Sequence, residues 1–110
     1  MESETLRCQK LEIVDQNGKC RMVLYAEESH SSIIFLQEDS PYMQIRVSKK
    51  GDANISMLDK AGAVRSSFGL VEAGNVGFSF NDIEGKPRLM GGIWGDSNKA
   101  TVICNGQQIA

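Results

Sequence analysis

The sequence predicts an all-β protein built from about four antiparallel β-hairpins and one further strand near the C-terminus. Short runs of β-branched, aromatic and other apolar residues flank tight polar turns, and no stretch keeps the period of an amphipathic helix. A pattern of aspartate, two residues, glycine, two residues and arginine also occurs three times, which indicates a repeated unit. The length suits one hydrophobic core, so we expect a single all-β domain over residues 1–110.

The repeat aligns three segments without gaps around their central turns. The first two copies stand about twice as far apart as the last two, so a fourth unit is expected between them. That unit lies around Asp39, lacks the glycine and contains Pro41, which leaves its turn and its place in the sheet open. The complete copies are Asp15, Gly18 and Arg21; Asp59, Gly62 and Arg65; and Asp82, Gly85 and Arg88.

Each unit is expected to form a strand, a tight turn and a second strand. Turn-rich links over residues 26–32, 48–52 and 72–75 join one hairpin to the next. A run of apolar residues before Asn105-Gly106 indicates one more strand and a tail. The expected hairpins cover residues 11–26, 33–48, 54–71 and 76–95, and the final strand covers residues 100–104.

A four-residue type I turn followed by a bulge explains the spacing of the motif. Aspartate at the first position accepts backbone N–H groups, and glycine at the fourth takes a positive φ. The alternative is a two-residue turn at Asn17-Gly18, but the equivalent Ala61-Gly62 and Glu84-Gly85 pairs lack that signal.

The bulge places each motif arginine on the face of its aspartate, where a guanidinium can pair with the carboxylate. We expect these pairs to help set turn and register, since exposed ion pairs contribute at most about 1 kcal/mol. The arginine stems would then lie on apolar residues of the same face. Those apolar residues are Leu11, Ile13, Ile55, Met57, Phe78 and Phe80.

This pattern resembles the Asp-x-x-Gly-x-x-Arg β-hairpin repeats of bacterial proteins that mostly remain uncharacterised. The resemblance covers about residues 11–95. It implies repeated hairpins and implies no catalytic residue, because the family supplies none to carry over.

The composition and charge of the chain indicate which partners and which cellular compartment to expect. The net charge is −2 and the basic residues are scattered, so nucleic acid is not expected as a partner. The N-terminus is polar and acidic, and no apolar run approaches the length of a membrane span, so we expect a cytoplasmic protein without membrane contact. Cys8, Cys20 and Cys104 are too far apart for a zinc site and are expected to be free thiols.

Candidates for catalysis and for metal binding have simpler structural explanations. A Ser-His-Asp relay would need His30 with one of the neighbouring Ser29, Ser31 or Ser32, but a solvated loop histidine fits that context better. The motif aspartates could bind calcium, yet one carboxylate per turn is too few. We therefore expect no catalytic residue, metal or cofactor.

Gly91, Gly92 and Trp94 form the most unusual local composition, and with Tyr25 and Tyr42 they are candidates for a ligand site or an interface. Glycines beside a tryptophan can let a flat ligand approach its ring, although large aromatics more often serve cores and subunit contacts. A cleft near Trp94 would be bordered by Asp82 and Arg88.

Two classes of function follow. The first is a non-catalytic module that associates with itself, as a dimer or trimer, or with a protein partner, its hairpins forming a prism, a sandwich or a solenoid-like arrangement. The alternative is a small-ligand-binding protein or hydrolase with the cleft near Trp94. Self-association is expected because the sequence places apolar residues on both faces of several strands. In addition to those under the arginines, they are Leu24, Phe35, Leu36, Ile45, Val47, Phe68, Leu70, Leu89 and Ile93.

Overall fold

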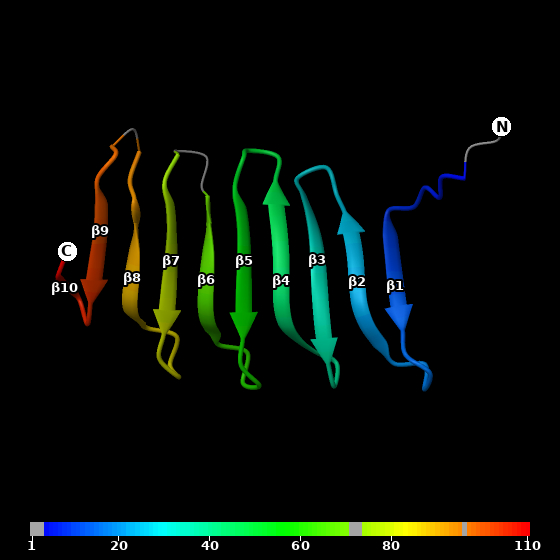
Figure 1. The fold of residues 1–110 in the computed structure, drawn as a ribbon. Coiled ribbons are helices and arrows are strands. Elements are labelled where there is room, and N and C mark those ends of the chain that lie inside the picture. The colour runs from blue at the N-terminus through cyan, green and yellow to red at the C-terminus, as the bar shows by residue number, and fades with distance from the viewer. Residues whose placement is uncertain (1–3, 71–73, 96) are drawn as a thin grey trace.

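A computed structural model, which describes residues 4–70, 74–95 and 97–110, confirms the all-β class. Ten antiparallel strands form one open sheet, in which each strand pairs with its neighbours in the sequence (Figure 1). The described residues contain no helix. The strands are β1 (Lys10–Val14), β2 (Cys20–Ala26), β3 (His30–Gln37), β4 (Ser40–Ser48), β5 (Ala53–Leu58), β6 (Val64–Leu70), β7 (Val76–Asn81), β8 (Pro87–Ile93), β9 (Ala100–Cys104) and β10 (Gln107–Gln108).

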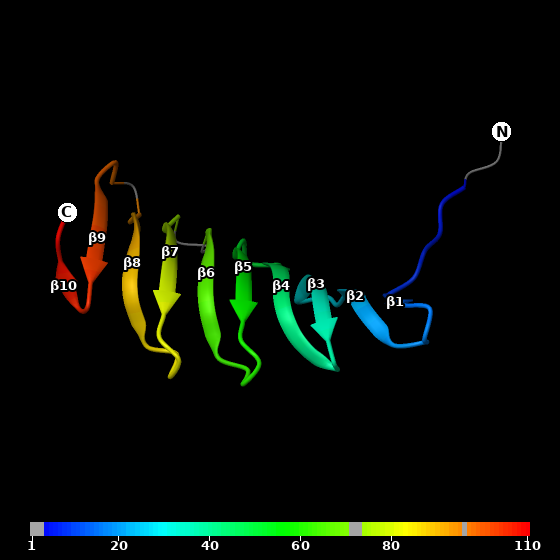
Figure 2. The same ribbon diagram turned by 60° about the horizontal axis from the view of Figure 1, so that its bottom comes forward.

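The sheet has a single layer (Figure 2). Residues 4–70, 74–95 and 97–110 therefore contain neither the second sheet of a sandwich nor the closed shape of a prism or solenoid, and such shapes would require further copies. The reason lies in the connections, which are short and join each strand to an adjacent antiparallel strand, so that none crosses to a second layer.

The expected hairpins correspond to the pairs β1–β2, β3–β4, β5–β6 and β7–β8. The final strand, β9, covers the expected residues, and the tail turns back at Asn105-Gly106 to form β10. Both turn residues have positive φ, as an Asn-Gly turn requires. Residue 71, at the expected end of the third hairpin, and residues 72–73 of the next link lie outside the described residues, as do residues 1–3 of the N-terminus.

The motif turns have the geometry that the spacing indicates. In the first hairpin Gly18 N–H donates to the Asp15 carbonyl at 2.9 Å, and Asp15 N–H donates to the Lys19 carbonyl at 2.9 Å. The third and fourth hairpins repeat both bonds. Gly62, for example, has a φ of 89°. The four-residue turn with a glycine bulge is confirmed, and the two-residue turn at Asn17-Gly18 is not formed.

A second irregularity, which the sequence analysis did not anticipate, falls at each motif arginine. Met57 pairs with Ser66 and Leu58 with Val64, so Arg65 is an extra residue without a partner across the strand. The first and fourth hairpins show the same shift at their arginines. The motif therefore marks two bulges, one at glycine and one at arginine.

The second hairpin keeps the later bulge but uses another turn. Gln37 pairs with Ser40, and the intervening Glu38 and Asp39 both have positive φ, 51° and 65°. This is a two-residue turn of the type that twists with the strands. Tyr42 is the extra residue of the register shift, the position that arginine occupies in the other hairpins.

The register aligns apolar residues into rows that cross the sheet on one face, because residues directly opposite each other point to the same side. The central row runs over nine strands, β1 to β9, and a second row lies on one side of it and a third on the other. We call this the apolar face. Its rows are Leu11, Leu24, Ile33, Ile45, Ile55, Phe68, Phe78, Gly91 and Val102; Ile13, Met22, Phe35, Met43, Met57, Ser66, Phe80, Leu89 and Cys104; and Ala26, Ser31, Val47, Ala53, Leu70, Val76, Ile93 and Ala100.

One expectation about faces was wrong. The apolar residues singled out from the sequence do not occupy both faces: all lie on the apolar face except Leu36, which stands at the register shift of the second hairpin. The unanticipated second bulge causes this difference, because it changes which side the later residues of the strand face. Arg65 is itself the extra residue of its bulge, so strand alternation does not assign its stem to a face, and the expected position of the arginine stems stays a prediction.

The opposite face is polar or small at its centre. One row there contains Ser56, Ser67 and Ser79, and the next contains Gly69, Gly77 and Gly92. A Cβ at Gly69 would lie 2.2 Å from the Ala53 carbonyl oxygen, so a side chain there would collide with backbone.

Among the described residues only Gly91 is buried. It lies under the ring of Phe78 on the neighbouring strand, and a Cβ at Gly91 would come 2.8 Å from Cε1 of that ring. The described part of a single chain therefore contains no hydrophobic core of its own.

The turn assignment predicts that Gly62→Ala destabilises the protein more than Ala61→Gly does. Apart from Gly62 and its two chain neighbours, no described residue has an atom within 4 Å of a Cβ built on Gly62, so the cost comes from its φ of 89° rather than from a clash. We expect a loss of about 1 kcal/mol or more. Urea midpoints of both variants at one protein concentration measure it, and equal midpoints would contradict the assignment.

Candidate functional site: the apolar face of the sheet

The apolar face is the largest chemically uniform surface of the described chain. Among the described residues, ten of the sixteen large apolar residues that are exposed belong to it. Phe68, Phe80 and Val47 each keep 50% of their surface open to solvent. None of the residues in its three rows is charged. An antiparallel sheet normally packs such a face on a core, and here no layer formed by the described residues covers it.

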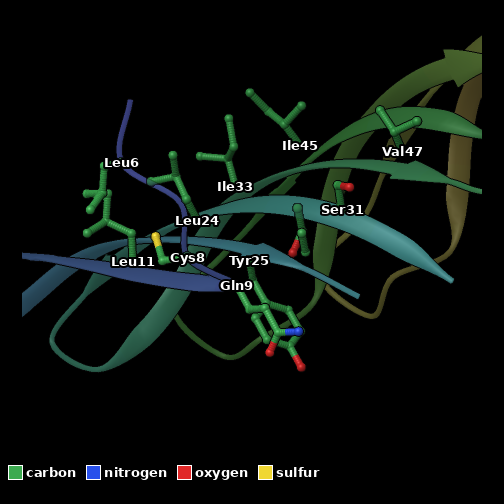
Figure 3. A pocket seen from close by; sticks show the side chains of 12 residues that line it. Leu6, Cys8, Gln9, Leu11, Leu24, Tyr25, Ser31, Ile33, Ile45 and Val47 are labelled. Atoms are coloured by element: carbon green, nitrogen blue, oxygen red, sulfur yellow. The ribbon is translucent and has the colours of Figure 1, made fainter. Parts of the chain in front are cut away.

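Figure 3 shows the end of this face near β1. The side chains of Leu11, Leu24, Ile33 and Ile45 point to one side of the sheet, whereas Tyr25 points to the other. With Leu6 from the preceding segment these residues line an open hollow of about 570 Å³. Most of its exposed wall is apolar, although Gln9, Ser31 and Ser32 also line it, and this composition favours apolar contact over a polar ligand.

The motif carboxylates use their two oxygens for different tasks. Oδ1 of Asp15 accepts N–H bonds from Asn17 at 2.8 Å and from Lys19 at 3.1 Å, while Oδ2 lies 3.7 Å from Nη1 of Arg21. Oδ1 of Asp59 and Asp82 likewise accepts two backbone N–H bonds in each turn. One oxygen therefore holds the turn and the other holds the arginine of the bulge.

All three expected ion pairs form. Oδ2 of Asp59 lies 3.6 Å from Nη1 of Arg65, and Oδ2 of Asp82 lies 2.9 Å from Nε of Arg88. The arginines are about half exposed, so the pairs contribute mainly to geometry.

Backbone N–H bonds from Lys19 and Asn17 lower the pKa of Asp15, and Arg21 lowers it further. A backbone bond from Lys86, together with the hydrogen bond from Arg88, lowers the pKa of Asp82. A depressed pKa keeps these carboxylates ionised and does not suit a general acid.

The third and fourth hairpins are joined at their turn ends. Arg65 Nε donates to the Asn81 carbonyl at 2.9 Å, and Asn81 Nδ2 donates to the Val64 carbonyl at 2.8 Å. Arg65 thus contacts its own turn through Asp59 and the next hairpin through Asn81. This reciprocal bridge holds β6 and β7 together where their ladder ends.

His30 does not assemble a serine relay with its neighbours. Ser29 Oγ lies 3.0 Å from His30 Nδ1, and Glu27 Oε2 lies 3.9 Å from the same nitrogen. A relay needs the nucleophile at one ring nitrogen and the carboxylate at the other. Ser31 and Ser32 follow in β3 and point to opposite faces by strand alternation.

The aromatic candidates are not brought together. Tyr25 belongs to β2, where its hydroxyl donates to Glu27 at 2.7 Å and this bond raises the tyrosine pKa. Tyr42 lies in β4 at the bulge. Trp94 follows β8, six strands from β2 in the sheet. They therefore cannot form one site within a chain.

A groove of about 360 Å³ does lie beside Trp94, on the face opposite the apolar one. Its floor consists of the serine and glycine rows, and the Trp94 ring lies close to Gly92. The expected border was wrong: Arg88 stands near the other end of β8, and Asp82 in the turn before it, because an extended strand separates residues 88 and 94 by about 20 Å.

The part of the chain that the structure describes has no group of three or more His, Cys, Asp or Glu side chains placed to hold a metal ion. It also has no helix of the length and hydropathy needed to cross a membrane. Cys8, Cys20 and Cys104 are free, as expected.

Comparison with known proteins gives no functional assignment. No protein-family model matches the chain, and no curated protein matches it. Functional inference therefore depends on the surfaces described above.

The lowered pKa values of Asp15 and Asp82 predict acid sensitivity. Because the folded pKa lies below the unfolded value of about 3.8, these groups stabilise the fold above that pH, and their contribution is lost as pH falls through the folded pKa. Asp82→Asn keeps the acceptor oxygen but not the charge. We expect its urea midpoint to lie below that of the wild type at about pH 6 and to equal that of the wild type at about pH 2. A difference of the same size at both pH values would contradict this account.

Proposed function

We propose that this protein is a non-catalytic association module whose apolar face packs against the same face of other copies, in a closed oligomer of two or three chains. The observation that supports this most strongly is the set of three apolar rows that no part of the described chain covers. Apolar burial is the dominant favourable term in such contacts.

The size of the face suits an interface between proteins. Nine strands spaced by about 4.8 Å and three rows about 7 Å apart give a surface of roughly 800 Å². This equals the area that each partner buries in a stable protein complex of standard size. A second copy supplies an equal area of the same chemistry, and symmetric packing would cover both.

A charged partner fits this face less well. Its rows contain no lysine, arginine, aspartate or glutamate, whereas the turn ends and the opposite face carry charged residues such as Arg46 and Lys10. Packing apolar face to apolar face leaves those charges in water and avoids their desolvation.

The groove beside Trp94 supports a second candidate, the binding of a small ligand. Ser67, Ser79 and Asn75 offer polar groups around the tryptophan, on the face that association would leave open. Asp82 and Arg88, which the sequence places at the border of this cleft, stand away from the groove, so the groove residues that the structure describes support binding rather than hydrolysis.

We also propose the cytoplasm as the location of the protein, since three unpaired cysteines suit a reducing compartment.

Sedimentation velocity at micromolar concentration tests the proposal. We expect the wild type to sediment as two or three chains or a multiple of that number, and Phe68→Glu to lose the face contact and sediment with fewer chains, because it places a charge in the central row. Ser67→Glu is the matched control, since it introduces the same group one residue away on the opposite face. Circular dichroism should show whether the Phe68→Glu sheet persists alone or unfolds, and either result agrees with loss of association.

The contradicting outcome is a folded wild-type monomer of 12.1 kDa at all concentrations. Equal dissociation by Ser67→Glu and Phe68→Glu would instead place the contact outside the apolar face.

A further inference from the structure

The two edges of the sheet differ. The outer edge of β9 is covered by the chain's own C-terminus, because Ile109 N–H donates to the Val102 carbonyl at 2.8 Å and Val102 N–H donates to the Ala110 carbonyl at 2.9 Å. At the other edge no described residue lies alongside β1, and the segment before it leads away from the sheet (Figures 1 and 2). The open edge of β1 is a template for another strand.

Hydrogen bonding defines which groups of β1 are directed outward. Ala26 N–H donates to the Gln9 carbonyl at 3.0 Å, so Gln9 begins the ladder with β2. In an antiparallel ladder the bonded residues alternate, which directs the backbone of residues 9, 11 and 13 to β2. The N–H and C=O groups of Lys10 and Glu12 therefore point to the open side.

We propose that β1 pairs antiparallel with β1 of a second copy, about a two-fold axis that passes through Leu11. Leu11 is the midpoint of Gln9–Ile13, the stretch that is in regular register with β2. In this pairing Lys10 stands opposite Glu12 of the second copy, and Glu12 opposite its Lys10. Each such pair exchanges two main-chain hydrogen bonds through the groups that point outward.

Charge selects this register. A shift of the pairing by one residue would place the outward N–H and C=O groups of one β1 opposite residues whose groups point to their own β2. No hydrogen-bonded ladder would then form between the two copies. The next registers that allow bonding place Lys10 opposite Lys10, or Glu12 opposite Glu12, and like charges directly opposite are destabilising. Within one chain Lys10 Nζ already lies 3.2 Å from Glu12 Oε1. The proposed pairing sets this ion pair beside the same ion pair of the second copy in the reverse direction, so each charge lies next to an opposite charge.

The edge pairing extends the sheet without disturbing the apolar face. A two-fold axis perpendicular to the sheet keeps the apolar rows of both copies on the same side, with Leu11 beside Leu11 of the second copy. The pairing uses main-chain bonds and charges, so it does not depend on the proposed face packing. If both contacts form, the complete assembly contains twice as many chains as the face-packed oligomer.

Charge-swapped variants test the pairing by sedimentation. We expect Lys10→Glu and Glu12→Lys each to halve the number of chains in the complex, with at least about a tenfold rise in the dissociation constant of the edge contact. The double variant Lys10→Glu/Glu12→Lys should restore the wild-type mass. An equimolar mixture of the two single variants should restore it as well, because every pair across the edge is then opposite in charge.

Disulfide formation tests the register directly. In a background with Cys8, Cys20 and Cys104 replaced by serine, Leu11→Cys should cross-link two chains, since residues of a non-bonded antiparallel pair have Cα atoms about 4.5 Å apart. Ile13→Cys is the control: it shares the apolar face, but its two copies would lie about 13 Å apart along the strands. Phe68→Glu should leave the Leu11→Cys cross-link intact, which separates this contact from the face packing.

The proposal is overturned if Leu11→Cys cross-links no better than Ile13→Cys, or if Lys10→Glu and the double variant sediment alike. Loss of the cross-link in the Phe68→Glu background alone, while circular dichroism shows that the sheet persists, would also overturn the independent edge contact.

Discussion

A sheet with one layer cannot bury its own apolar face. Each strand of this protein pairs only with its neighbours in sequence, so ten strands extend side by side and none returns above them. Backbone hydrogen bonds are satisfied along the ladder, but the hydrophobic contribution that stabilises most domains is not available within a chain. No described part of the chain covers the three apolar rows, and we propose that a second copy, which offers a surface of equal size and chemistry, covers them.

The turns make this face continuous. A register shift by one residue would move every side chain of a strand to the other side, so three rows across nine strands need accurate hairpins. Asp59 illustrates how this is achieved: one carboxylate oxygen fixes the turn through two N–H bonds, and the other holds Arg65 at the second bulge. Arg65 then reaches the carbonyl of Asn81, which aligns the next hairpin.

The sequence was informative where chemistry is local. The glycine bulge at Gly62, the carboxylate bonds of its turn and the strand positions follow from residue spacing alone. The bulge at Arg65 could not be derived, because an unpaired residue inside a strand leaves no turn signal. Without this bulge, strand alternation assigns apolar residues to both faces of the sheet. The apolar rows, with members such as Ile33 and Met43, depend on the registers of all successive strand pairs, which residue spacing does not specify. The separation of Arg88 from Trp94 likewise depends on strand direction.

The methionines report most directly on whether the apolar face is covered in solution. Met57 lies on that face and is 40% exposed in a single chain, whereas Met90 lies on the opposite face. Peroxide converts accessible methionine to its sulfoxide, and mass spectrometry measures the rate at each residue. The account predicts that Met57 oxidises more slowly than Met90 in the assembled protein and gains speed on dilution. Oxidation of Met57 at least as fast as that of Met90, with a rate independent of protein concentration, would contradict it.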